Sequence, residues 1–217
     1  MSRPVIAIDG PAGSGKSTLA RSLATELGMP YINTGLMYRV VALRALRAGV
    51  PSDDAAALGR LARHIDFELD ERAQPPALSI DGRPPEPEVT SPDVELTVPQ
   101  VSAHPEVRGV LRSEQRRLAS GGAVMEGRDI GSIVAPEAPL KLYLSAHPTE
   151  RAGRRAGERS EEPAAVAETL EARDARDART NPFVPAADAV LLDTTDLSAA
   201  DVLERALELV RQRGIAS

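Results

Sequence analysis

The sequence contains no cysteine, which excludes disulfide bonds and thiolate chemistry. It has no apolar run near the roughly 20 residues that a membrane helix requires, and its first residues hold no hydrophobic signal-peptide region. We therefore expect a cytoplasmic protein without a membrane partner. Tryptophan is absent and aromatic residues make up only 2% of the 217 residues, so the 42% of hydrophobic residues must form an aliphatic core.

Lysine is also scarce, because Lys16 and Lys141 are the only two and the other 24 basic residues are arginine. Genome base composition is the simpler explanation for that excess of arginine. The formal net charge of −6 argues against a general nucleic-acid partner, because such proteins are usually basic. The three histidines show no metal-ligand spacing, and no Ser-His-Asp arrangement stands out. This length fits one α/β domain with an embellishment, and we expect a monomer.

Short apolar runs alternate with helical patterns along the chain, which favours an α/β fold with a parallel sheet covered on both faces. Thr34 is predicted to cap the second helix, and a helical pattern that begins at Asp93 is expected to break at Pro99. The expected strands are 5–9, 31–32, 67–71, 77–82, 123–126, 140–144 and 190–193. The expected helices are 16–27, 34–47, 54–63, 105–120, 148–158, 164–179 and one that begins at Ser198.

Between the first expected strand and helix, residues 10–17 read GPAGSGKS and match the phosphate-loop pattern G-x-x-x-x-G-K-[ST]. Glycines let successive backbone N–H groups turn toward an anion, and the following helix directs its positive end at it. We expect Lys16 to contact the β- and γ-phosphates of ATP and Ser17 to coordinate Mg²⁺. The alternative is a glycine-rich turn that happens to precede a lysine, and the strand–loop–helix context argues against it. The residues predicted to bind ATP are Gly10, Pro11, Ala12, Gly13, Ser14, Gly15, Lys16, Ser17 and Thr18.

Several classes of enzyme share this loop, and other features separate them. A GTPase should carry an N-K-x-D string, and neither lysine lies in one. An ATP-driven machine usually has further domains, for which 217 residues leave little room. A small phosphotransferase fits best, and it needs a second site for the acceptor of the phosphate.

The motif NTGLMYR, residues 33–39, follows the second expected strand and so leaves the sheet at the same edge as the loop. Arg39 could bind a phosphate there, and Tyr38 could pack against a sugar or base. The alternative is that Tyr38 belongs to the core and Arg39 is a solvated charge.

The motif EGRDIG, residues 126–131, ends another expected strand, and we expect Arg128 and Asp129 to point into the same crevice. The alternative is a salt bridge at the strand end. Arg108, near the start of the helix 105–120, is a third candidate cation.

Four arginines share one side of the expected helix 148–158 and its end, at offsets 0, 3, 4 and 8: Arg151, Arg154, Arg155 and Arg159. As part of a mobile lid they would close over transferring phosphates and exclude water. The alternative is a solvated basic face.

Together these motifs resemble the bacterial cytidylate kinases, a family that transfers the γ-phosphate of ATP to CMP and dCMP. The resemblance covers nearly the whole chain and rests on AIDGPAGSGKST, NTGLMYR, HPEVRGVLRSEQR, VMEGRDIGSIVAPEAPLKLYL, ARDARD and PAADAVLLDTTDLS. It implies a three-layer α/β phosphate-loop kinase fold with a central parallel sheet, a small β-containing acceptor-domain insert and an arginine-rich lid. The implied divisions are a core of 1–34, 105–147 and 180–217, an acceptor region of 35–104 with its insert at about 65–97, and a lid with the following helix at 148–179.

The resemblance also implies roles for single residues, with Mg²⁺ as the cofactor. Because the phosphate of CMP is already an anion, the transfer needs no general base. The residues expected to bind CMP are Thr34, Tyr38, Arg39, Arg108, Arg128, Asp129, Arg173 and Asp177. The residues expected to act in catalysis are Lys16, Arg39, Arg128, Arg151 and Arg155.

Some positions depart from the family pattern. Pro99 stands where members commonly have a serine that reads the base, and Thr180 stands where they commonly have an arginine, with Arg179 one residue early. Both departures concern base recognition, so a UMP/CMP kinase of relaxed specificity stays open beside the CMP/dCMP kinase. Another small-metabolite kinase and a regulatory module that binds nucleotide without transfer are further alternatives. Asn33 replaces a frequent aspartate, with smaller consequence.

Overall fold

The computed structural model describes residues 4–159, 167 and 184–215, so the expected helix 164–179 lies outside the described residues except at one position. A seven-stranded sheet runs through its centre in the order β3-β4-β2-β5-β1-β6-β7. Every neighbouring pair is parallel except β3 with β4, which confirms the predicted parallel sheet apart from one edge strand. The strands are β1 (Val5–Asp9), β2 (Tyr31–Asn33), β3 (Phe67–Asp70), β4 (Ala77–Ile80), β5 (Ala123–Gly127), β6 (Leu140–Ser145) and β7 (Val190–Asp193).

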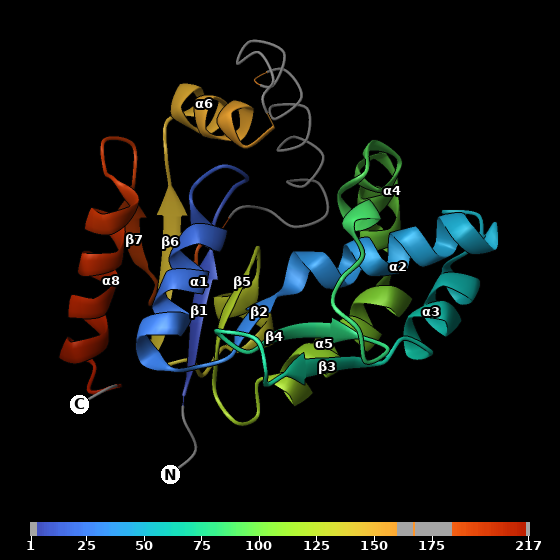
Figure 1. Cartoon of the computed structure of the whole chain (residues 1–217), viewed down its shortest axis with the longest axis horizontal. Coiled ribbons are helices and arrows are strands. Elements are labelled where there is room, and N and C mark those ends of the chain that lie inside the picture. Colours follow the sequence, from blue (N-terminus) through green and yellow to red (C-terminus); the bar gives the residue numbers. More distant parts are fainter. Residues whose placement is uncertain (1–3, 160–166, 168–183, 216–217) are drawn as a thin grey trace.

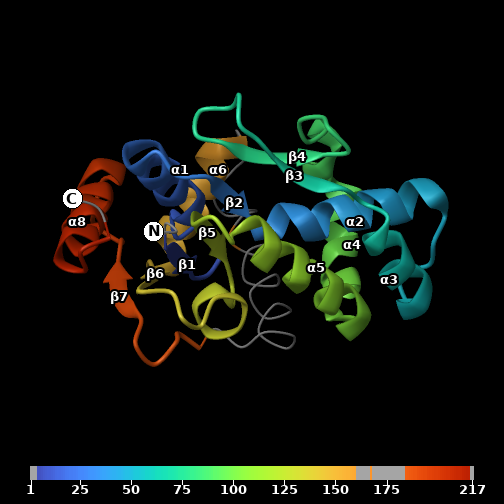
Figure 2. The same ribbon diagram turned by 90° about the horizontal axis from the view of Figure 1, so that it is seen from below.

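The sheet is the middle of three layers (Figures 1 and 2), and successive residues of a strand face opposite layers. In β1, Ile6 and Ile8 pack with Leu23 of α1, whereas Ala7 packs with Met37 of α2. The helices are α1 (Lys16–Leu27), α2 (Thr34–Ala48), α3 (Ala55–Arg63), α4 (Pro92–Ala103), α5 (Pro105–Leu118), α6 (Pro148–Arg159) and α8 (Ala199–Gln212). Short helical turns lie at Pro87–Thr90 and Ile130–Val134.

The ends of the molecule differ in character. Helices α2, α3 and α4 form a lobe at one end, and β7 with α8 lies at the other (Figure 1). The expected insert contributes β3 and β4, and these join the central sheet, since Ala77 of β4 pairs with Tyr31 of β2. None of the described helices is both long and apolar enough to cross a membrane.

The residue that caps α2 is Asn33, and the prediction of Thr34 was wrong. The Asn33 side chain accepts a hydrogen bond from the backbone N–H of Leu36. Thr34 already lies inside the helix, and its hydroxyl donates to the backbone carbonyl of Glu126 on β5 at 2.7 Å. A tertiary contact thus takes the hydroxyl that the local pattern assigned to the cap, and the adjacent amide side chain replaces it.

The expected break at Pro99 is also absent, because α4 continues through it to Ala103. Val94 and Val101 lie seven residues apart, on one face of the helix, and both are fully buried. This packing on both sides of Pro99 offsets the one helical hydrogen bond that proline cannot donate.

Candidate active site

The phosphate loop leaves β1 and enters α1, as its motif predicts. Gly13 has a φ of +75°, and a Cβ there would lie 2.7 Å from the carbonyl oxygen of Arg151, so glycine lets the loop pass this close to α6. Lys16 Nζ donates to the carbonyl of Pro11 at 2.6 Å. The ammonium group therefore lies over the backbone to which the motif assigns phosphate binding.

Beside the loop is a pocket of about 300 Å³ that the sequence patterns did not single out. Arg154 of α6 lines it, with Nη1 3.0 Å from Thr194 Oγ1 and Nη2 2.5 Å from the Thr194 carbonyl. Thr194 directly follows the last parallel strand, at the sheet edge where the loop lies. This position in the sequence could have predicted that it lies at the site. The pocket is lined by Thr18, Leu19, Arg154, Thr194, Leu197 and Val202, among others.

Glu126, near the end of β5, is a buried carboxylate beside the start of α1, with an exposed fraction of 3%. Ser17 Oγ donates to its Oε2 at 2.8 Å, and the Tyr31 hydroxyl donates to its Oε1. Burial and the charge of Glu126 raise the pKa of Tyr31, so its phenol stays protonated across the neutral range. Sequence reasoning missed both residues, although a carboxylate at the end of a buried strand was a usable signal.

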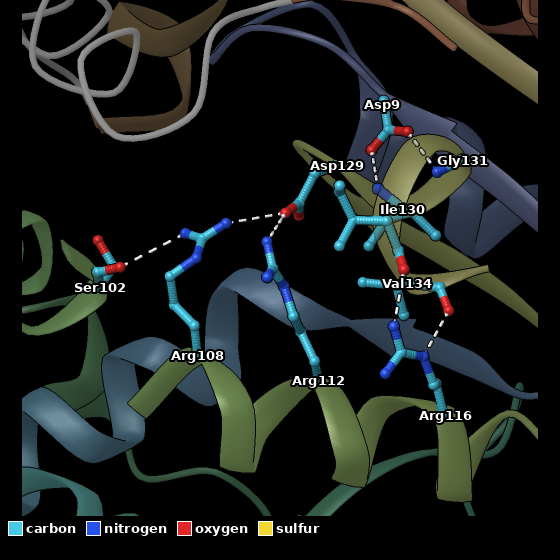
Figure 3. A network of polar contacts seen from close by, with 10 residues as sticks. Asp9, Ser102, Arg108, Arg112, Arg116, Asp129, Ile130, Gly131 and Val134 are labelled. Atoms are coloured by element: carbon cyan, nitrogen blue, oxygen red, sulfur yellow. Dashed lines mark hydrogen bonds and ion pairs between the residues drawn. The ribbon is translucent and has the colours of Figure 1, made fainter. Parts of the chain in front are cut away.

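The carboxylate of Asp9, the last residue of β1, accepts hydrogen bonds from the backbone N–H groups of Ile130 and Gly131, each at 2.8 Å (Figure 3). Burial raises the pKa of Asp9, while the two N–H donors and the charge of Lys16 lower it part of the way. This contact fixes the turn Ile130–Val134 against the strand that precedes the phosphate loop. Asp9 is a further residue that sequence reasoning missed.

The predicted acceptor residues around EGRDIG are brought together. Arg128 Nη1 donates to the Gly10 carbonyl at 2.5 Å, which places this guanidinium on the phosphate loop. Arg108 Nη2 donates to Asp129 Oδ2 at 2.9 Å (Figure 3). Arg112, which the sequence patterns did not single out, donates to the same oxygen at 2.7 Å. Arg112 comes four residues after Arg108 and so lies on the same helix face, and this spacing could have predicted that it joins the pair.

Arg39 is not a solvated charge. It donates to the Val89 carbonyl and to Glu95 Oε1, each at 3.1 Å. Arg155 of α6 donates to the same oxygen of Glu95 at 3.4 Å. Glu95, on α4, therefore joins an arginine of the predicted acceptor region to an arginine of the predicted lid, and sequence reasoning missed it.

Tyr38, on α2, is partly buried and packs against the core, as the core alternative held. Burial raises the pKa of its phenol, and the charge of Arg108 on α5 offsets part of that rise. The phenol is therefore near enough to the Arg108–Asp129 pair for their charges to act on it.

The arginines of α6 point in different directions. Arg151 is buried and donates to the Ala12 carbonyl at 3.0 Å, so it contacts the phosphate loop directly. Arg154 and Arg155 reach the pocket and Glu95, as described above. Outside the described residues lie Arg173, Asp177, Arg179, Thr180 and the side chain of Arg159.

Solved structures share this fold. An uncharacterized protein from Eubacterium ventriosum ATCC 27560 superposes with a TM-score of 0.54 at 10% identity, covering 96% of this chain and 99% of that one. TT1252 from Thermus thermophilus superposes with a TM-score of 0.50 at 21% identity, covering 98% of both chains.

Sequence comparison is more specific. A family model for cytidylate kinase matches residues 6–212. The chain is 41% identical over 216 residues to the cytidylate kinase of Desulfitobacterium hafniense (strain Y51), covering 96% of this chain and 93% of that protein. It is 42% identical over 221 residues to the cytidylate kinase of Solibacter usitatus (strain Ellin6076), covering 97% of this chain and 94% of that protein. The bifunctional pantoate ligase/cytidylate kinase of Synechococcus sp. (strain JA-3-3Ab) is also 42% identical, but this chain spans only 41% of its length. The chain therefore belongs to the cytidylate kinase family of ATP-dependent nucleoside monophosphate kinases.

Proposed function

We propose that the protein transfers the γ-phosphate of ATP to CMP or dCMP and releases ADP with CDP or dCDP. The observation that carries the proposal is a second cationic site that touches the phosphate loop. Arg128 contacts the loop carbonyl of Gly10, and the next residue, Asp129, is paired with Arg108. A module that only binds ATP has no use for this second site.

The adenine of ATP is proposed to occupy the pocket of about 300 Å³ beside the loop. Leu197 and Val202 supply apolar wall, and Arg154 supplies a planar guanidinium that can stack on a base. From this pocket the triphosphate would run along the loop toward Lys16.

Mg²⁺ is proposed to bind together with the phosphates. Hydroxyl and carboxylate oxygens are ligands that this ion prefers, and Ser17 Oγ lies 2.8 Å from Glu126 Oε2. Across the described residues, no group of three or more histidine or acidic side chains lies close enough to hold a metal alone, which suits an ion shared with ATP. Ser17, supported by Glu126, would hold the ion, which neutralises charge on the β- and γ-phosphates when bound.

The transfer itself requires little from the protein beyond position and charge. A phosphate oxygen of CMP attacks the γ-phosphorus, and the bond to the oxygen that bridges the β- and γ-phosphates breaks, so ADP leaves. Arg39 and Arg128 are proposed to hold the attacking phosphate, and Lys16 to stabilise the transferred group. Arg151 and Arg155 of α6 are proposed to add further positive charge around the transferred group. In this proposal α6 acts as a lid that excludes water.

Base recognition is assigned to Asp129 and Arg108. Cytosine presents an amino group next to the acceptor N3, whereas uracil presents a carbonyl oxygen next to an N–H. A carboxylate oxygen beside a guanidinium N–H offers the complementary pattern for cytosine. The contact of 2.9 Å between Arg108 and Asp129 places the two groups side by side.

The test is ADP release with ATP·Mg²⁺ and, one at a time, CMP, dCMP, UMP, AMP and shikimate. Turnover with CMP and dCMP far above the other acceptors supports the proposal. Comparable turnover with UMP would keep the kinase and assign it relaxed base specificity. A protein that binds ATP yet releases no ADP with any acceptor would be a binding module, and the proposal would be wrong.

A further inference from the structure

Three arginines at consecutive turns of α5 reach toward the segment Asp129–Val134 (Figure 3). Arg116 donates to the backbone carbonyls of Ile133 and Val134 at 2.8 and 3.0 Å. Arg108 and Arg112 instead converge on one oxygen of Asp129, Oδ2, at 2.9 and 2.7 Å. No described residue donates to the other oxygen, Oδ1.

The two arginines that hold Asp129 are not equivalent. Arg108 also reaches α4, because its Nη1 lies 3.4 Å from the carbonyl of Ser102. Arg108 is therefore held by both Asp129 and α4. Arg112 makes the shorter contact with Asp129, and its buried Nε has no hydrogen-bond partner among the described residues. A buried donor without a partner lowers the stability of the folded protein. The contribution of Arg112 to folding therefore does not by itself account for its position.

We propose that Arg112 is a specificity-determining positioning residue for the acceptor base. This inference rests on the proposed function, in which Asp129 accepts the amino group of cytosine. By holding Oδ2 independently of α4, Arg112 keeps the carboxylate in one orientation, with Oδ1 as the acceptor for that amino group. Without Arg112, Asp129 is held by Arg108 alone and can turn to accept the N3–H of uracil. The residue thus favours 4-aminopyrimidine over 4-oxopyrimidine nucleotides.

The experiment measures kcat/KM for CMP and for UMP in the wild type and in Arg112→Met, with saturating ATP·Mg²⁺. Methionine keeps the apolar part of the side chain and removes its charge. The ratio of kcat/KM for CMP to that for UMP is expected to fall about tenfold in Arg112→Met, the loss of one charge-assisted hydrogen bond of about 1.4 kcal/mol. The KM for ATP should stay unchanged. Arg112→Lys, which restores a cation, should recover part of the ratio.

Arg116→Met is the matched control, because it makes the same change one turn later and removes contacts to the same segment but not to Asp129. It is expected to lower the melting temperature at least as much as Arg112→Met and to leave the CMP-to-UMP ratio unchanged. A ratio that falls equally in both variants would overturn the role of Arg112, as would an unchanged ratio in Arg112→Met.

A double-mutant cycle tests the route through Asp129. If Arg112 acts through Asp129, Arg112→Met should lower the ratio no further in an Asp129→Asn background. Independent, additive losses would contradict the inference. Failure of the wild type to phosphorylate CMP would instead contradict the proposed function, so the two failures are distinguishable.

Discussion

Glu95 on α4 accepts a hydrogen bond from Arg39 on α2 at 3.1 Å, and both side chains are mostly buried. The same Glu95 oxygen lies 3.4 Å from Arg155 on α6. A carboxylate therefore stands between two arginines that are proposed to bind phosphate. An incoming phosphate must compete with it.

Glu95→Gln should lower the KM for CMP about threefold, because the variant removes an anion that competes for Arg39 in a partly buried pair. Steady-state kinetics with varied CMP at saturating ATP measures this. A rise in the KM for CMP would mean that Glu95 orients the arginines and does not compete with substrate.

Lys16→Ala should reduce kcat by about 10³ or more, since it removes the cation that is proposed to stabilise the phosphoryl group in transfer. Lys141→Ala is the control, because it removes the other lysine of the chain. Lys141 pairs with Asp188 at 2.8 Å, so its loss should lower the melting temperature and leave kcat within a small factor. Equal kcat in the two variants would remove Lys16 from the mechanism.

Tyr31→Phe should raise the Mg²⁺ concentration needed for half-maximal activity several-fold. The variant removes the hydroxyl that donates to Glu126, the carboxylate that also accepts from Ser17. Titrating Mg²⁺ at fixed, saturating ATP and CMP measures the shift. An unchanged Mg²⁺ requirement would separate Tyr31 from the metal site.

Asp9 should leave a signature in the pH dependence of stability. Because burial raises its pKa above the ordinary value of 3.8, the folded protein binds this proton more tightly than the unfolded chain does. Its contribution to the free energy of unfolding is then fully present below about pH 3.8 and is lost as pH rises through the folded pKa. Urea unfolding measures this from pH 4 to 7. The free energy of unfolding of the wild type minus that of Asp9→Asn should fall as the pH rises. A difference that rises with pH would mean that the N–H donors outweigh burial.

Gly127→Ala should destabilise the protein by about 1–3 kcal/mol, because a Cβ there would lie 2.5 Å from Thr34 Oγ1 and 2.7 Å from Ile130 Cδ1. Gly109→Ala is the matched control, since no atom lies within 4 Å of its Cβ position on α5. That control should gain up to about 1 kcal/mol from the better helix propensity of alanine. Denaturant unfolding measures both, and equal stabilities would contradict the contact at Gly127.

The features that the sequence predicted well are those whose residues are contiguous in the chain. The phosphate loop, with β1 before it and α1 after it, was predicted with the observed bounds because all its signals lie within residues 5–27. The pairing of Tyr31 with Glu126 and that of Arg39 with Glu95 span long separations, and they depend on which strand or helix becomes a neighbour. No local pattern contains that information.

The errors have the same origin. Thr34 has the chemistry of a cap, but its hydroxyl is taken by β5. Pro99 has the chemistry of a helix break, but the core packing of α4 outweighs it. The roles proposed for Arg173 and Asp177 stay predictions, because these residues lie outside the described part of the chain.

The turn Ile130–Val134 is held by Asp9 from the strand before the phosphate loop and by Arg116 from α5. Neither set of contacts involves the side chains of Arg108, Arg112 or Asp129, which are proposed to act on the acceptor. The residues that hold this turn thus differ from those that are proposed to set the acceptor preference. Exchanging those three side chains should therefore alter acceptor preference while leaving the contacts that fix the turn beside the phosphate loop in place.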